Sequence, residues 1–177
     1  MDIKGRLIEG NNRFIDEVNG NPHLRELTSM LVEGQKPYAI VISCSDSRVI
    51  PEMIFSTDPG ELFIIRTAGN LINEGEIASI EYGIAHLGIK YILVLGHTRC
   101  GAIHASIEDE GGEYISCLTE RIKKNIHGIH DEYLASKENA KAEARFILEK
   151  FPSYDGIIEP AIYHIDTTKV EFIDIGQ

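Results

Sequence analysis

Three short, almost unbroken apolar runs constrain the fold of this chain more than any other feature. They are YAIVIS at 38–43, LFIIR at 62–66 and YILVL at 91–95. Strands that are buried on both faces of a parallel sheet have this composition, whereas half-exposed strands alternate apolar and polar residues. Between the last two runs, apolar residues recur at helical spacing, namely Ile77, Ile80, Ile84 and Leu87. Strand, helix and strand at this length predict a βαβ unit with a right-handed crossover.

Segments on both sides of this unit predict further helices. Residues 2–18 place apolar side chains on one stripe, and 22–32 begins with a proline, so we expect two helices in an N-terminal arm. Residues 113–151 predict helical structure with a break near Gly128. Within that segment, 137–150 is rich in Ala, Glu and Lys, a composition that favours an exposed helix.

The end of the chain predicts two short strands. Residues 157–164 and 169–173 are separated by a turn, which favours a hairpin at the edge of the sheet. We therefore expect an α/β fold with a mostly parallel central β-sheet flanked by helices, an N-terminal helical arm and a C-terminal edge hairpin. No repeat, low-complexity tract or linker divides the sequence, so residues 1–177 are expected to form a single domain.

Charge and hydropathy argue against two classes of partner. The formal net charge of -11 is unfavourable for nucleic acid, because phosphate binding requires a basic face. No segment approaches the roughly 18 consecutive apolar residues that a membrane helix needs, and the N-terminal segment lacks the apolar stretch of a signal peptide. We therefore expect a cytoplasmic protein with no nucleic-acid or membrane partner.

Two polar clusters directly follow two of the predicted strands. CSDSR begins at Cys44, and HTRC runs from His97 to Cys100. Functional sites in open α/β sheets form at the carboxyl ends of strands, so this topology can bring the clusters together. One cysteine alone would more often be a small buried hydrophobic residue. Two thiolates and one imidazole together are a plausible zinc set, with a fourth position left for water as in catalytic sites. The third cysteine, Cys117, falls in a predicted helix and is expected to be a buried free thiol.

Asp46 and Arg48 lie two residues apart in the first cluster. A guanidinium beside a carboxylate keeps the carboxylate ionised and oriented. Considered alone, such a pair would only stabilise a turn. Beside a metal ligand, the pair could accept a proton from zinc-bound water, or Asp46 could swing onto the metal as a fourth ligand and close the site.

These clusters and their surroundings resemble the β-class carbonic anhydrases. CSDSR at 44–48 and GHTRCG at 96–101 are similar to the two zinc motifs of that family. The likeness extends, in order and spacing, to LIEGNNRF at 7–14, VIPEMIF at 49–55, PGELFIIRTAGN at 59–70 and IASIEYGIAHLGIKYILVLGH at 77–97. The resemblance is dense through these segments and weak in the C-terminal third.

The resemblance implies a metal, a catalytic dyad and a reaction. Zinc (Zn²⁺) would be bound by Cys44, His97 and Cys100, with Asp46 and Arg48 as the dyad. The implied reaction is the reversible hydration of CO2 to bicarbonate by attack of zinc-bound hydroxide. Because two thiolates offset most of the charge of the metal, we expect a less acidic water than in a site with three His ligands. Activity should therefore rise into the alkaline range.

The resemblance also implies a substrate pocket and an assembly. The pocket beside the metal would be lined by four residues at matching positions, Gln35, Phe63, Tyr82 and Gly101. Gln35 would donate a hydrogen bond to a substrate oxygen, and the two aromatic rings would form apolar walls. Considered without the family resemblance, Gln35 could equally be an exposed loop amide. Phe63 and Tyr82 could equally be core aromatic residues. The family assembles as dimers or larger, so we expect a homodimer or higher homo-oligomer.

Some positions depart from the family pattern and leave other functions open. Val41 stands where members with a bicarbonate-inhibited closed state carry Trp, although Arg66 matches the Arg of those members. One alternative is a COS or CS2 hydrolase on the same zinc site, since those molecules are linear and isosteric with CO2. Another is a non-catalytic zinc-binding homologue, against which the Asp46–Arg48 pair argues. A cysteine-dependent redox enzyme or phosphatase is disfavoured, because Cys44 lacks a glycine-rich anion cradle.

Overall fold

The computed structural model describes residues 2–176, and their contacts divide these residues into two compact units. The first unit ends at Lys36 and the second begins at Pro37. The single domain expected over residues 1–177 therefore stays a prediction. Within the described residues, no helix combines the length and the apolar character that crossing a membrane requires.

The first unit contains two helices, α1 (Ile3–Gly20) and α2 (Pro22–Leu31). Asn21 lies between them, and its side chain accepts hydrogen bonds from backbone N–H groups at the start of α2. This cap stabilises the helix, and Pro22 suits the first turn, where a backbone N–H would be unpaired in any case. The predicted N-terminal helices are confirmed.

The second unit is built on a five-stranded sheet with the spatial order β2-β1-β3-β4-β5. Its strands are β1 (Ala39–Cys44), β2 (Leu62–Thr67), β3 (Tyr91–His97), β4 (Ile157–Tyr163) and β5 (Val170–Phe172). The first four are parallel to one another, and β5 pairs antiparallel with β4 at the edge. The mostly parallel sheet and the C-terminal edge hairpin are thus confirmed. Every residue of β1 is buried, in agreement with its unbroken apolar sequence.

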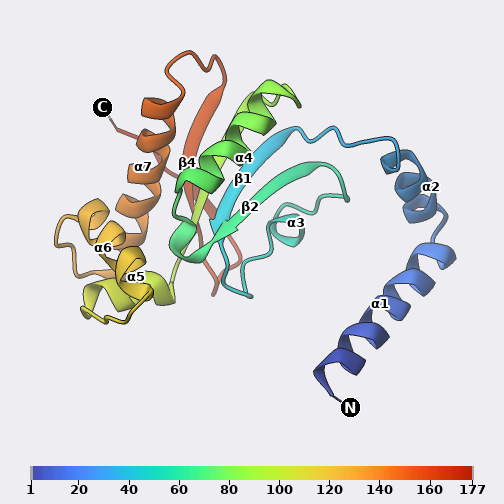
Figure 1. Ribbon diagram of the computed structural model, residues 1–177, viewed down its shortest axis with the longest axis horizontal. Coiled ribbons are helices and arrows are strands. Elements are labelled where there is room, and N and C mark those ends of the chain that lie inside the picture. The colour runs from blue at the N-terminus through green and yellow to red at the C-terminus, as the bar shows by residue number, and fades with distance from the viewer. Residues whose placement is uncertain (1, 177) are drawn as a thin grey trace. The chain divides into compact units, whose positions relative to one another are not determined.

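Helices cover the sheet and extend beyond its end. They are α3 (Pro51–Ile54), α4 (Glu74–Ala85), α5 (Gly101–Ile107), α6 (Ile115–Ile126) and α7 (Glu132–Lys150). One core joins Ile40 and Ile42 of β1 to α4 and α7, whereas Val41 points into a second core on the opposite face, near α3. Figure 1 shows α7 running beside β4, with α5 and α6 gathered beyond one end of the sheet.

Helix α7 contradicts the expectation that residues 137–150 form an exposed helix. Seven of its residues are buried, among them Ala140, Ala144 and Ile147. Alanines allow a helix to approach a sheet closely, and α7 packs against Gly96 of β3, where a Cβ would lie 3.4 Å from the backbone oxygen of Ser136 and 2.8 Å from Cδ1 of Ile162. Composition alone was misleading because the small residues occupy the buried face.

Short elements at the carboxyl ends of the strands were not predicted. They are α3, α5 and the single 3-10 turn Ala68–Asn70 (η1) that follows β2. Gly69 in this turn has a φ of 67°, a region that favours glycine, and a Cβ there would lie 2.9 Å from Cδ1 of Ile122. These elements surround the residues that carry the predicted chemistry.

Candidate metal centre

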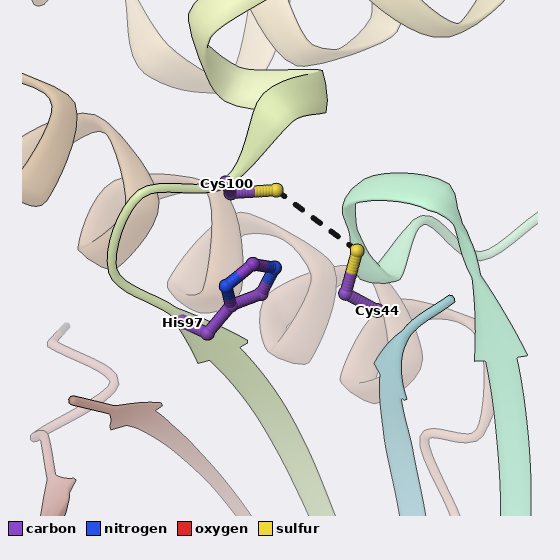
Figure 2. Close-up of side chains that lie close together, drawn as sticks. All are labelled: Cys44, His97 and Cys100. Atoms are coloured by element: carbon purple, nitrogen blue, oxygen red, sulfur yellow. Dashed lines mark hydrogen bonds between the residues drawn. The ribbon is translucent and has the colours of Figure 1, made fainter. Parts of the chain in front are cut away.

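The three predicted metal ligands meet at the carboxyl ends of two neighbouring strands. Cys44 ends β1, His97 ends β3, and Cys100 lies just before α5. One ligand atom from each residue lies within 4.8 Å of the others, and all three residues are buried. Figure 2 shows the imidazole ring of His97 beside the two sulfurs. This is the one cluster of metal-ligating side chains among residues 2–176.

The chemistry of this cluster fits zinc. The Nδ1 atom of His97 lies 3.0 Å from the carbonyl oxygen of Thr98, which only accepts hydrogen bonds, so Nδ1 carries the hydrogen. The Nε2 atom consequently has a free lone pair, and it is buried with no hydrogen-bond partner. The sulfurs of Cys44 and Cys100 are 4.0 Å apart. Two sulfurs each about 2.3 Å from a tetrahedral zinc ion would be separated by about 3.8 Å.

The two thiols share a hydrogen and therefore differ in acidity. The hydrogen bond with Cys100 lowers the pKa of the Cys44 thiol, assisted by the backbone N–H of Gly69, whose nitrogen is 3.4 Å from the sulfur. Donating that hydrogen bond, together with burial, raises the pKa of Cys100. Both thiols would lose their protons on binding a metal. A thiolate is the form of cysteine that binds a metal.

Asp46 and Arg48 form a bidentate ion pair beside the cluster. The Nε atom of Arg48 donates to Oδ1 of Asp46 at 2.9 Å, and its Nη2 atom donates to Oδ2 at 2.6 Å. These hydrogen bonds hold the pKa of the Asp46 carboxyl well below its usual range. The Oδ2 atom lies 4.0 Å from Nε2 of His97. An ionised, oriented carboxylate thus borders the space between the three metal ligands.

Among the proposed pocket residues of the second unit, Gly101 alone adjoins a metal ligand in the sequence. Gly101 adjoins Cys100 at the start of α5, and Gln35 belongs to the first unit. The rings of Phe63 and Tyr82 pack with centroids 6.1 Å apart. Phe63 pairs with Ile40 in the sheet, whereas Cys44 pairs with Thr67. Four positions along a strand correspond to about 13 Å, so Phe63 lies well away from the metal ligands of its own chain.

Comparison with known proteins identifies the family. The sequence model of a family described as carbonic anhydrase matches residues 39–151. A carbonic anhydrase from Synechococcus elongatus is 33% identical over 174 residues, which cover 94% of this chain and 58% of that protein. The solved structure of the β-carbonic anhydrase CcaA is 29% identical, with a TM-score of 0.83 over 98% of this chain and 96% of that one. The chain belongs to the β-class carbonic anhydrase family.

The extent of these matches differs between relatives. The chain spans little more than half the length of the S. elongatus protein, 58%. A β-carbonic anhydrase from Sordaria macrospora, one of two described as tetrameric, is 22% identical, with a TM-score of 0.82 over 96% of this chain and 95% of that chain. At that identity the likeness shows the fold alone, which is an α/β fold around a mostly parallel sheet.

In this member of the family, Arg66 has a defined structural role. Its Nε atom donates to the carbonyl oxygen of Cys44 at 3.2 Å, and its Nη2 atom donates to that of Asp46 at 2.8 Å. Arg66 therefore holds the backbone of the Cys44–Arg48 loop. Arg48 also donates to the carbonyl oxygen of Arg99 at 3.0 Å, which joins the two motif loops.

A histidine and the third cysteine lie outside the cluster. His86 caps the end of α4 and stacks on Tyr82, with ring centroids 5.1 Å apart. Cys117 is exposed on α6, so the expectation that it is buried is wrong. Its thiol donates to the carbonyl oxygen of Tyr114.

Sequence reasoning missed a group of buried polar side chains behind the cluster. Asn139 and Glu143 of α7 are both fully buried, and both form hydrogen bonds with the segment that follows β2. Their spacing of four residues was visible in the sequence. Within a segment rich in Ala, Glu and Lys, however, nothing distinguishes them from the solvated side chains around them.

Proposed function

We propose that the chain catalyses the reversible hydration of CO2 to bicarbonate, with a zinc ion held by Cys44, His97 and Cys100. The observation that carries the proposal is the ionised Asp46 carboxylate at the edge of the ligand cluster, 4.0 Å from His97 Nε2. A purely structural zinc site is closed by four protein ligands and needs no such group. Bound zinc would lower the pKa of a water molecule and so supply the nucleophile.

Asp46 and Arg48 have separate roles in this proposal. Asp46 stays ionised and would accept a hydrogen bond from the attacking hydroxide, which leaves a lone pair of that hydroxide directed at CO2 so that its attack gives bicarbonate. Arg48 binds both carboxylate oxygens and so keeps Asp46 off the metal. Arg48 is itself fixed by the carbonyl oxygen of Arg99. This double attachment supports an open metal site in the resting protein.

The proposed pocket includes Gln35, Phe63, Tyr82 and Gly101. Because Phe63 lies four strand positions from the level of Cys44, it cannot touch a small substrate at the metal of its own chain. Phe63 and Tyr82 would therefore line a CO2 pocket only where a second copy of the chain presents them. Tyr82 is 46% exposed, so its ring is accessible for such a contact.

We further propose a homodimer or higher homo-oligomer. The first unit exposes large apolar side chains, including Leu7 at 70% and Phe14 at 53%. Apolar side chains exposed together on a protein surface commonly mark interfaces. The tetrameric description of the S. macrospora relatives supports the same proposal. Light scattering coupled to size exclusion would measure the mass, and a monomer at micromolar concentration would contradict it. The cytoplasmic location stays a prediction.

The direct test is stopped-flow CO2 hydration by zinc-loaded protein, from about pH 6.5 to about pH 9.5. We expect rapid hydration that increases toward the alkaline limit and is absent in Cys44→Ala. Cys117→Ala is the matched control, because it removes an exposed thiol outside the ligand cluster and should leave the rate unchanged.

Two results would contradict the proposal. Protein that binds one zinc ion per chain but does not hydrate CO2 should next be assayed with COS and CS2, which distinguishes a hydrolase from a non-catalytic homologue. Equal hydration by the wild type and Cys44→Ala would exclude the proposed metal site.

A further inference from the structure

Two fully buried polar side chains of α7 are not used by the proposed reaction. Asn139 and Glu143 have no solvent exposure and lie four residues apart, which places them on the same face of the helix. A buried amide and a buried carboxylate each cost free energy unless their hydrogen bonds are satisfied. The hydrogen-bond partners of Asn139 and Glu143 therefore indicate which part of the structure the two side chains hold in place.

Both residues bind the segment that follows β2. The Nδ2 atom of Asn139 donates to the carbonyl oxygen of Gly69 at 2.9 Å, and Oε2 of Glu143 accepts from the backbone N–H of Ile72 at 3.0 Å. The α7 helix thus holds the segment at two points, three residues apart. Neither contact is with a side chain, so the arrangement fixes the path of the backbone.

A third side chain connects the two. The Nδ2 atom of Asn125, on α6, donates to Oδ1 of Asn139 at 2.9 Å and to Oε1 of Glu143 at 2.7 Å. Arg121, also on α6, forms an ion pair with Glu143 at 3.3 Å. The network therefore joins two helices to one backbone segment.

The same segment touches a metal ligand. The backbone N–H of Gly69 donates to Sγ of Cys44, at a nitrogen-to-sulfur distance of 3.4 Å. Figure 2 shows the turn after β2 passing close to the Cys44 side chain. On its other side, Gly69 packs so closely that an added Cβ would lie 2.9 Å from Ile122 and 3.3 Å from Ala102. The position of this N–H is thus limited by packing and by the hydrogen bond from Asn139.

We propose that Asn139 and Glu143 are positioning residues for the metal centre, which hold the Gly69 N–H against the Cys44 sulfur. The inference rests on the proposed zinc site. A thiolate that accepts a hydrogen bond donates less charge to a metal. A metal bound to such a thiolate keeps more of its own charge. Groups that contact ligands in this way commonly change metal affinity by about 10- to 100-fold.

The test compares Asn139→Asp and Asn139→Ala with the wild type. Asn139→Asp preserves the shape and the acceptor for Asn125 but replaces the donor to Gly69 with an oxygen. Asn139→Ala removes the side chain without burying a charge. If the Asp variant does not fold, the Ala variant is measured in its place. Ile147→Val is the matched control, since it alters the buried face of α7 at a position that packs in the main sheet core.

Two measurements separate positioning from general destabilisation. Competition with a chelator should show zinc affinity reduced about 10-fold or more in the Asn139 variants, because the Cys44 sulfur is no longer held in position by the Gly69 N–H, and unchanged in the control. After substitution with Co²⁺, the thiolate-to-cobalt charge-transfer absorption should move to lower energy in the Asn139 variants, because the sulfur has lost its hydrogen bond. The Ile147→Val band should match the wild type.

Failure of this inference can be distinguished from failure of the proposed function. Wild-type protein that binds no zinc and hydrates no CO2 would overturn the function and this inference together. If the wild type binds zinc and hydrates CO2, an unchanged cobalt band and unchanged zinc affinity in a folded Asn139 variant would overturn the inference alone.

Discussion

The two motif loops come from neighbouring strands and differ in how far side chains anchor them. In the His97–Cys100 loop, the backbone N–H of Thr98 donates to the carbonyl oxygen of Tyr163, which extends the pairing of β3 with β4. His97 and Cys100 are 1% and 2% exposed. In the Cys44–Arg48 loop, the backbone N–H of Ser45 likewise donates to the carbonyl oxygen of Thr67, and the Arg66 side chain in addition binds the carbonyl oxygens of Cys44 and Asp46. The Asp46 and Arg48 side chains there are 17% and 48% exposed.

This difference separates two requirements of such a site. Metal ligands need fixed geometry and exclusion of water, which the sheet supplies through continuous backbone pairing. Asp46 has to meet a small substrate that comes from solvent, so its loop lies at the surface beyond the paired backbone and is held there by the Arg66 side chain as well. The first loop joins the two roles, because it carries Cys44 as well as the ion pair.

The largest expected effect is the same for both loops. Cys44→Ala and Cys100→Ala should each reduce hydration to the uncatalysed rate, because either change leaves two protein ligands for zinc. Metal analysis of the purified proteins should find far less than one zinc ion per chain. Full zinc occupancy in either variant would contradict the assigned ligand set.

The next effect should separate the loops. Asp46→Asn removes the ionised carboxylate but none of the three metal ligands, so zinc should remain bound while the hydration rate falls by about 10²- to 10⁴-fold. The rate is measured by stopped flow and the zinc content on the same sample. Loss of zinc together with activity would show that Asp46 supports the metal and not only the reaction.

A smaller pair of effects tests how each loop is anchored. Arg66→Met removes both donors to the first loop and should lower the rate roughly 10- to 100-fold through misplacement of Asp46. Thr98→Val removes only the acceptor for the N–H of Ile165, since the backbone bond to Tyr163 remains. It should cost about 1 kcal/mol of unfolding free energy and change the rate little. Equal rate losses would mean that the loops are anchored alike.

The smallest effect concerns the edge hairpin beside the second loop. A hydrogen bond from Lys137, and a second from Tyr133, lower the pKa of Glu171 to about 2. Because the folded-state pKa lies below the ordinary value of about 4.3, this carboxylate stabilises the fold above that pH. The stabilisation is lost as the pH falls toward 2.

Glu171→Gln should therefore flatten the dependence of unfolding free energy on pH between about pH 4 and about pH 2. The contribution is small, because the Glu171 side chain is 35% exposed and solvent screens the pair. Urea unfolding at a series of pH values measures it. An unchanged slope would contradict the assignment, and the hydration rate at alkaline pH should stay as in the wild type.

The sequence contained enough to place the metal ligands but not their surroundings. Cys44, His97 and Cys100 could be grouped because apolar runs predict parallel strands, whose carboxyl ends lie at one edge. Asn139 could not be linked to Gly69, since the two are 70 residues apart and no local pattern connects them. The expected exposed helix failed for a related reason. Ala, Glu and Lys favour any helix, and only the tertiary packing decides which face is buried.

The strand order β2-β1-β3 also bears on how the chain folds. The chain places β2 and α4 between β1 and β3, yet β1 and β3 are neighbours in the sheet. Cys44 and Cys100 are 56 residues apart, so their meeting requires closure of a long loop, which is slow relative to local helix formation. A metal bound at these residues would stabilise only chains in which that crossover is complete, and metal availability would then set the fraction of chains that stay folded.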